Sequence, residues 1–243
     1  LVNLSVNHFR NIAQHMHVIT TSNRPMLQAR ATNTDYKSLT QTILANGLLD
    51  YYLREKRLEH YLKRAVEFAI VMGAGWVKMA WNATSGEAID FNDELQTEIF
   101  EGDVEFSNLS PLDVVVDTYK ENTDFDWVIC RSYKNRYDLA AKYPEIEKEI
   151  LAVRTKSDLE RYNFGMISVS DKTDEVPVYE FYHKRTESMP EGRYIMYLSE
   201  DAVLEDVALP YRSIPVFRMS PSDILGTPFG YTAMFDILPI QAA

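Results

Sequence analysis

The spacing of apolar residues changes once along this chain, at Gly73, and this change limits the fold more than any other feature. Over residues 58–72, apolar side chains recur every three or four positions, the period of a helix with one buried face. Residues 76–81 (Trp-Val-Lys-Met-Ala-Trp) follow the two-residue period of a strand, and Gly73 and Gly75 separate the two patterns. The chain is therefore predicted to be α+β, with helices first and a sheet after Gly73.

Three helices are predicted before Gly73. Polar residues followed by Pro25 end the first one, because they compete with the helical backbone and proline cannot continue it. In the second, Leu39, Ile43 and Leu49 are expected to point inward. The predicted ranges are residues 2–20, a helix capped by Asn33, Thr34 or Asp35 that runs to about Leu53, and residues 58–72.

Short strands and two short helices are predicted after Gly73. A turn is expected at residues 82–86, and the first short helix should end at Tyr143-Pro144. Residues 165–176 are small and polar, which is typical of a loop. Because strands and helices do not alternate regularly, a mixed, mainly antiparallel sheet is expected. The predicted strands are 76–81, 97–106, 113–116, 126–133, 178–185, 193–199, 203–206 and 214–218, and the helices are 138–142 and 145–161.

We expect one α+β domain over residues 1–228, made of a helical part (1–73) and a sheet part (74–228). The apolar segment 229–243 is predicted to begin a helix that leads out of this domain. That helix meets no closing Gly, Asn or basic residue before the last position, and the chain begins with leucine instead of methionine. The sequence is therefore expected to be part of a longer protein.

Composition limits the environment of the chain. At 243 residues and 46% hydrophobic, it can bury a sizeable core. No window approaches the ~18 uninterrupted apolar residues of a membrane helix, so no membrane partner is expected. Cys130 is the only cysteine, which excludes a disulfide within the chain and suits a reducing, cytoplasmic compartment. It stands beside Ile129 within a predicted strand and is expected to be a small core residue.

Charge is unevenly distributed along the sequence. The net charge is −11, and residues 79–119 contain no Lys, Arg or His. Such a surface repels nucleic acid and either contacts water or pairs with a basic partner surface. Four basic residues have helical spacing and should share one helix face: Arg57, His60, Lys63 and Arg64. The carboxylates of the acidic stretch are Glu87, Asp90, Asp93, Glu94, Glu98, Glu101, Asp103, Glu105, Asp113 and Asp117.

The sequence contains no convincing cofactor or metal motif. The Gly73-Ala74-Gly75 segment follows a helix, whereas a dinucleotide loop must follow a strand. Residues 90–101 place oxygen ligands at several positions of a calcium hand, but Leu95 occupies the position that requires glycine. The five histidines have no zinc spacing. We therefore expect no cofactor, no metal and no enzyme activity.

Asp113 and Asp117 support the one enzymatic alternative. On a strand their side chains would face the same side, as the carboxylates of a metal-dependent nuclease do. An acidic-x-Lys strand would normally accompany them, but the only such tripeptide is Asp35-Tyr36-Lys37, where Asp35 is better explained as a helix cap. Divalent-metal binding that disappears in an Asp113→Ala variant would favour the nuclease.

The order of several short segments resembles the portal proteins of tailed bacteriophages, especially the larger portals of short-tailed phages. The resemblance spans nearly the whole chain, and its specificity lies in the order, since each segment is common by itself. The segments are Gly73 to Trp81, Gly102-Asp103-Val104, Ser110 to Asp117, Asp126 to Arg131, Tyr143-Pro144, Val178 to His183, Leu209-Pro210-Tyr211, Ile214-Pro215-Val216, and Gly226 with the apolar segment reaching Ile240-Gln241.

The resemblance implies a structural subunit of a dodecameric ring at one capsid vertex. Such a ring contacts the major capsid and scaffold proteins, binds the terminase and the tail adaptors, and passes double-stranded DNA without sequence specificity during packaging and ejection. Its location would be the virion, and the host cytoplasm during assembly. Residues 1–228 would match the wing domain, and 229–243 would lead into a stem; the stem, clip and crown would lie outside this chain.

Head-to-tail contacts between separate acidic and basic surfaces can close into a ring. We therefore take Arg57, His60, Lys63 and Arg64 as the candidate subunit interface. A third possibility besides the portal and the nuclease is a soluble adaptor domain that binds a basic partner without forming rings.

Overall fold

The computed structural model describes residues 7–23, 27–92, 97–120, 124–153, 174–232 and 234–237. It confirms the predicted α+β class: N-terminal helices precede sheets, and every strand pairing in these ranges is antiparallel. The chain forms two compact units, Leu1–Pro111 together with Pro215–Ala243, and Leu112–Ile214. The boundary predicted between residues 73 and 74 therefore falls within the first unit, and the predicted sheet part supplies strands to both.

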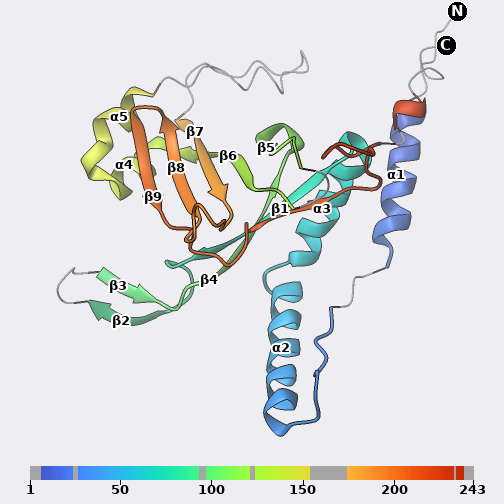
Figure 1. Cartoon of the computed structure of the whole chain (residues 1–243), viewed down its shortest axis with the longest axis horizontal. Helices are drawn as coiled ribbons and strands as arrows, with labels where there is room; N and C mark the ends of the chain where they lie inside the picture. The colour runs from blue at the N-terminus through green and yellow to red at the C-terminus, as the bar shows by residue number, and fades with distance from the viewer. Residues whose placement is uncertain are drawn as a thin grey trace, which may run out of the picture. The chain divides into compact units, whose positions relative to one another are not determined.

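The first unit contains three helices and two small sheets (Figure 1). In its three-stranded sheet the strand order is β10-β1-β4, and β2 pairs with β3 as a separate two-stranded ribbon between β1 and β4 in the chain. The predicted strand 97–106 is thus two strands, because Gly102 turns with a positive φ of 70°. The elements are α1 (His8–Thr21), α2 (Tyr36–Arg54), α3 (Leu58–Met72), β1 (Gly75–Asn82), β2 (Ala88–Asn92), β3 (Thr97–Phe100), β4 (Asp103–Leu109) and β10 (Val216–Met219).

Helix α3 has the predicted bounds and packs against β1. Its buried residues Ala65, Ala69 and Ile70 follow the apolar period, and β1 buries Trp76 and Val77. Gly73 ends the helix in the left-handed conformation, with φ of 84°, and its N–H donates to the Ala69 carbonyl. The glycine-rich segment is therefore a helix end, as predicted.

Helix α2 contradicts the expectation of a buried face. None of its residues is buried: of the three expected to point inward, Leu39 and Ile43 are exposed, and Leu49 is half-buried. Its C-terminal end is tied to the unit by aromatic and polar contacts: the Tyr52 ring lies 5.9 Å from the Phe106 ring, and the Tyr51 hydroxyl donates to Asp103. In the middle of the helix, the Asn46 side chain exchanges hydrogen bonds with the backbone of Ala29. The helical pattern is present in the sequence, but the described residues do not bury the apolar side chains of this helix.

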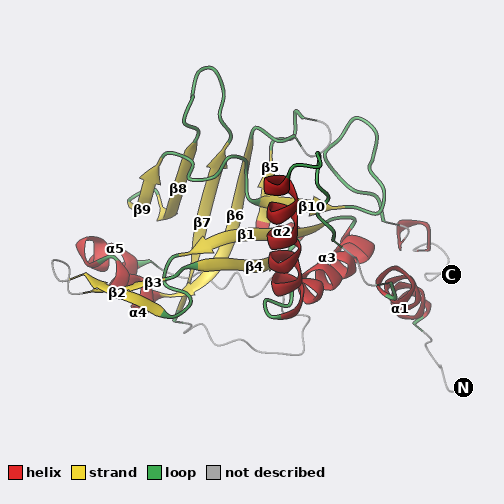
Figure 2. Cartoon of the chain, turned by 90° about the horizontal axis from the view of Figure 1, so that it is seen from below, coloured by secondary structure: helices red, strands yellow, loops and turns green. Residues whose placement is uncertain are grey.

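The second unit is built on one five-stranded sheet (Figure 2). The order β5-β6-β7-β8-β9 follows the chain, so each strand pairs with its neighbours in sequence. One hydrophobic core joins the short helices to the sheet. It includes Ile150, Val176, Val178 and Met196. The elements are β5 (Val114–Val116), β6 (Trp127–Asn135), α4 (Arg136–Lys142), α5 (Glu147–Ala152), β7 (Glu175–His183), β8 (Arg193–Ser199) and β9 (Ala202–Val207), with 3-10 turns at Pro111–Asp113 and Pro144–Ile146.

Several expected boundaries shift by one to three residues, strand β2 was not predicted, and larger changes occur in two segments. The helix expected over 145–161 is a 3-10 turn followed by α5, which ends at Ala152, and residues 154–173 lie outside the described residues. Most of the predicted loop 165–176 also lies there, but Val176 belongs to β7, where it pairs with Lys134 and is fully buried.

The segment 229–243 also begins differently from the prediction. Gly230 forms a bridge with Asp223, so the chain is still extended there, and the described helical turn covers residues 234–237. Residues 238–243 of the expected helix lie outside the described residues.

Candidate subunit interface

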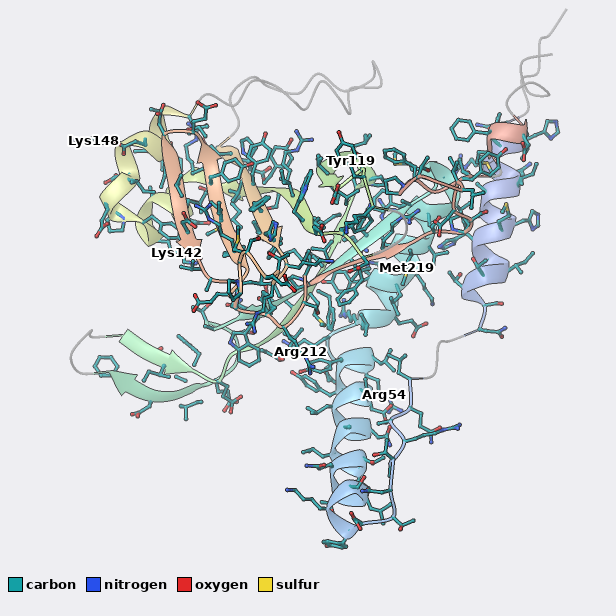
Figure 3. The ribbon with its side chains drawn as sticks, in the orientation of Figure 1. Arg54, Tyr119, Lys142, Lys148, Arg212 and Met219 are labelled. Atoms are coloured by element: carbon teal, nitrogen blue, oxygen red, sulfur yellow. The ribbon has the colours of Figure 1, made fainter. Side chains whose placement is uncertain are left out.

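Three of the four predicted interface residues come together where α2 meets α3. Arg57 caps α3, and His60 and Lys63 stand on its first two turns. With Leu53, Arg54 and Glu59 they line a cavity of about 540 Å³. Arg54, the last residue of α2 (Figure 3), was missed from the sequence, although it stands only three positions before Arg57. We call the surface formed by Arg54, Arg57, His60 and Lys63 the basic groove.

Arg57 has an unusual backbone. Its φ of 53° makes it the only non-glycine residue with a positive φ in the part of the chain that the structure describes. The left-handed conformation costs a residue with a Cβ free energy, so the surrounding structure must hold it in place. This conformation turns the chain between α2 and α3 and brings Arg54 and Arg57 to the same cavity.

The fourth predicted residue, Arg64, lies apart from the basic groove. Its guanidinium pairs with Glu67 at 2.5 Å and lies 5.1 Å from the centre of the Phe68 ring. Lys63 pairs with Glu59 at 2.7 Å but still lines the cavity. Among the described residues, neither Arg54 nor Arg57 has an ion pair. Arg54 and Arg57 are therefore the positive charges in the groove that a partner can bind.

The acidic stretch separates into carboxylates used within the chain and carboxylates left exposed. Glu105 accepts a hydrogen bond from Asn82, and Asp103, Asp113 and Asp117 have the internal partners described below. Asp93 and Glu94 lie outside the described residues. The exposed group belongs to the β2–β3 ribbon and its two ends, and in the described residues none of its members forms an ion pair: Glu87, Asp90, Glu98 and Glu101.

The β2–β3 ribbon also exposes apolar side chains. Ile89 is 65% exposed, Phe91 is 52% exposed and Ile99 is 44% exposed. Asp90 pairs with Ile99 across the two strands, and Phe91 pairs with Glu98, so apolar and acidic residues are interleaved. A two-stranded ribbon is marginally stable by itself, and grouped exposed apolar residues mark interaction surfaces. The ribbon is thus an acidic surface with an apolar component.

Asp103 ties β4 to the connection between α2 and α3. Its carboxylate accepts from Lys56 Nζ at 2.7 Å and from the Tyr51 hydroxyl at 2.8 Å. The hydrogen bond from Lys56 is the main cause that lowers the pKa of Asp103 below its ordinary value of 3.8. This contact holds the base of the basic groove to the three-stranded sheet.

Acid should weaken the Asp103 contact. Because its pKa is lower in the folded state than in the unfolded state, the carboxylate contributes stability above about pH 4, and this contribution is lost as the pH falls through the folded value. We expect the free energy of unfolding of the wild type to fall more steeply between about pH 4 and pH 2 than that of Asp103→Asn. Urea unfolding followed by tryptophan fluorescence measures both profiles. If the free energy of unfolding depends on pH in the same way for the wild type and for Asp103→Asn, the contact with Lys56 does not lower the pKa of Asp103.

The two carboxylates of the nuclease alternative do not lie on one strand, contrary to the prediction, because Asp113 belongs to a 3-10 turn and Asp117 follows β5. They also have separate structural partners. Asp113 Oδ1 accepts from Arg131 Nε at 2.9 Å and from Nη2 at 2.5 Å, and the two side chains are only 12% and 8% exposed. Asp117 Oδ1 accepts from the Tyr119 N–H at 3.0 Å. Burial opposes the charge of Arg131, but the bonds to Asp113 outweigh it, so the pKa of Arg131 is raised. Asp113 therefore acts as the counter-ion of a buried arginine.

Neither the histidines nor the cysteine forms a reactive cluster in the described residues, which contain no group of three or more His, Cys, Asp or Glu side chains suited to a metal. Cys130 is buried, as expected of a core residue. The calcium-like segment 90–101 contains the end of β2 and all of β3, and its residues 93–96 lie outside the described residues.

The second unit contains a buried acidic residue that the sequence analysis missed. Glu180 is 3% exposed and accepts a hydrogen bond from the Tyr182 hydroxyl. Burial, and then the charge of Glu180, raise the pKa of Tyr182 above its ordinary value of 10.0. Alternation along β7 was the available signal, because it places Glu180 on the same face as Val178 and Tyr182. The bonded phenol compensates for burial of the carboxylate, which is a structural role.

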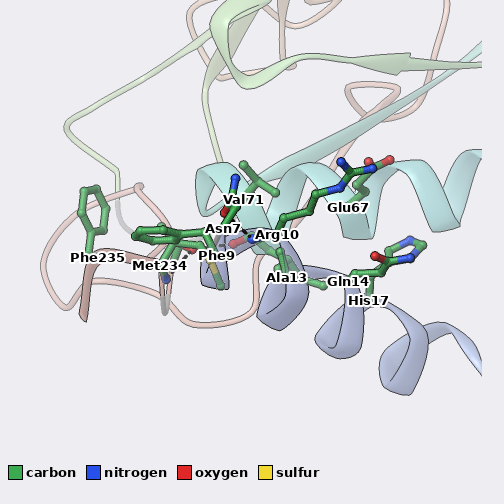
Figure 4. A pocket seen from close by; sticks show the side chains of 12 residues that line it. Asn7, Phe9, Arg10, Ala13, Gln14, His17, Glu67, Val71, Met234 and Phe235 are labelled. Carbon is green, nitrogen blue, oxygen red and sulfur yellow. Dashed lines mark hydrogen bonds between the residues drawn. The ribbon is translucent and has the colours of Figure 1, made fainter. Parts of the chain in front are cut away.

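A larger cavity lies between α1, α3 and the segment after β10. It measures about 770 Å³. In Figure 4, Phe9 and Met234 stand on its apolar side, whereas Arg10, His17 and Glu67 stand toward the other end. The Thr232 hydroxyl donates to the Ile70 carbonyl and joins the C-terminal segment to α3. The cavity therefore marks where the first and last described segments of this unit meet.

No helix in the described ranges is both long and apolar enough to cross a bilayer. No protein-family model matches this chain, and no curated protein matches it.

Proposed function

We propose that this chain is the wing portion of a phage portal subunit, a structural protein that forms a ring at one capsid vertex. The ring would form the channel for double-stranded DNA and the attachment point for terminase and tail. One observation supports this most strongly: the first unit carries an acidic, partly apolar ribbon and a separate basic groove. Two different complementary surfaces on one subunit allow head-to-tail contacts, which generate closed rings when the rotation permits.

The exposed face of α2 is consistent with an assembly. Ile43, Leu44 and Leu48 are all exposed on this helix, and it contributes no buried residue to its own unit. Most helical stability in proteins comes from packing of an apolar face, so a 19-residue helix without such packing suits a subunit that is covered by its neighbours.

The net charge of −11 suits a channel protein that must not hold DNA. Phosphates bind proteins by exchanging condensed counter-ions for Lys and Arg, and an acidic surface offers no such exchange. The duplex could then slide past without sequence-specific contacts. The nuclease alternative gains no support from Asp113, whose carboxylate is bound by Arg131.

The mass of the full-length protein in solution tests the proposal. We expect native mass spectrometry and negative-stain images to show a closed ring of about a dozen copies with a central channel, as head-to-tail closure requires. A stable monomer that binds a basic partner one-to-one would favour the adaptor alternative.

Reversing the charge of the predicted interface should prevent assembly. We expect a variant with Arg57, Lys63 and Arg64 all changed to Glu to remain folded, because these side chains are on the surface, but to lose the ring. Circular dichroism checks the fold, and native mass spectrometry checks the assembly. Intact rings from the folded variant would refute the assignment of this surface.

A further inference from the structure

Among the described residues, the β2–β3 ribbon pairs with no further strand of its own unit. Figures 1 and 2 both show it extending from β1 and β4 away from α2 and α3. Its carboxylates Glu98 and Glu101 are exposed and form no ion pair among the described residues, and Phe91 beside them is half exposed. A ribbon that exposes interleaved apolar and acidic side chains suits a basic surface that also offers apolar contacts.

The basic groove and the adjacent face of α2 have these properties. Arg54 and Arg57 line the groove, and neither has an ion pair in the described part of the chain. Leu44, Leu48 and Tyr51 are exposed at i, i+4 and i+7, which makes a continuous apolar strip along the helix that ends at Arg54. Charge and apolar area thus occur side by side here as they do on the ribbon.

We propose that the β2–β3 ribbon of one copy docks on the basic groove and apolar strip of the next copy. The partner is a second copy of this chain, and this choice rests on the ring assembly proposed above. Apolar contact of Phe91 and its neighbours with α2 supplies affinity, and the arginines opposite the ribbon carboxylates select the orientation. Because ribbon and groove differ, the contact is heterologous, and an open chain of copies has a free ribbon at one end and a free groove at the other.

Two charge-reversed variants of the full chain test this contact. The ribbon variant carries Glu98→Lys and Glu101→Lys, and the groove variant carries Arg54→Glu and Arg57→Glu. For each variant alone we expect the protein concentration at half-assembly to rise at least about tenfold, because like charges face each other. An equimolar mixture should assemble again, because lysine ribbons fit glutamate grooves and the unchanged ribbons fit the unchanged grooves. Native mass spectrometry should show the two variants alternating.

A matched control carries Glu187→Lys and Glu200→Lys on exposed loops of the second unit, which gives the same net charge as the ribbon variant. It should assemble as the wild type does. Unfolding curves confirm that each variant is folded, and if a reversal prevents folding, the neutral pair Glu98→Gln and Glu101→Gln replaces it, with a smaller loss expected.

The outcomes separate the docking contact from the ring. If the wild type forms rings and both charge-reversed variants still form them, the docking contact is overturned and the ring proposal stands. The same conclusion follows if the wild type forms rings and the mixture of the two variants fails to assemble. Open chains or dimers that follow the expected pattern of loss and rescue would support the contact and contradict the ring. A wild-type protein that stays monomeric at every concentration tested would overturn the contact.

Discussion

Replacing Gly75 by alanine is expected to lower the free energy of unfolding of the first unit by about 3 kcal/mol, at the upper end of overpacking effects. A Cβ at this position would lie 1.9 Å from the carbonyl oxygen of Ala65. The Cβ is fixed to its own backbone and the oxygen belongs to the backbone of Ala65, which is fully buried in α3, so no flexible side chain can move aside. Strand β1 is paired on both edges, with β10 and with β4, so it cannot move aside without breaking ladder hydrogen bonds.

Gly47→Ala is the matched control for this substitution. Gly47 lies within α2, where an added Cβ would meet nothing within 4 Å. Alanine should therefore stabilise the helix by up to about 1 kcal/mol, the difference in helix propensity. Urea unfolding of the wild type and of both variants measures the two effects. A Gly75→Ala variant as stable as the wild type would show that α3 and β1 are not in close contact.

Removing the carboxylate of Asp113 is expected to destabilise the second unit by about 3 kcal/mol, because it leaves the buried Arg131 without its counter-ion. The guanidinium side chain is 8% exposed and makes two hydrogen bonds to one oxygen of Asp113. In the variant, the guanidinium loses its counter-ion in a site where it has little hydration, and its other contacts, such as the Tyr133 ring at 5.6 Å, do not neutralise its charge. Asp113→Ala and Asp113→Asn should both lower the unfolding midpoint, and the alanine variant should do so more, since it offers no acceptor.

The pair Arg193–Asp206 provides the control within the same sheet. Its nitrogen and oxygen lie 2.7 Å apart, but the side chains are 48% and 45% exposed. Asp206→Ala should therefore cost no more than about 1 kcal/mol. Metal binding is measured on the same variants. Saturable divalent-metal binding by the wild type that disappears in a folded Asp113 variant would contradict the counter-ion role and revive the nuclease.

Much of the local structure follows from the sequence. Helix α3 and strand β8 have the predicted bounds, because each combines a clear apolar period with a turn signal at its end. The strand predicted over 97–106 failed because its two halves pair with different partners, β2 and β1. A period shows that a segment is extended, but it does not show which neighbour it pairs with.

The candidate subunit interface, too, could be predicted only in part from the spacing of residues along the chain. Helical spacing correctly placed His60 and Lys63 together, but it also included Arg64, which pairs with Glu67 and contacts the Phe68 ring instead. Arg54 was missed because it belongs to another helix, and only the left-handed turn at Arg57 brings the two helices to one cavity. Spacing within one helix cannot report a residue contributed by its neighbour.

The sequence alone determined the α+β class, with helices before strands, and the separation of acidic from basic segments, because these depend on interactions between residues close in the chain. The tertiary structure alone decided which apolar and charged faces remain uncovered. Helix α2 and the β2–β3 ribbon have the patterns of ordinary packed elements, yet both are exposed. Burial depends on what surface lies opposite, and partners such as β1 and β10 are more than a hundred residues apart in the chain.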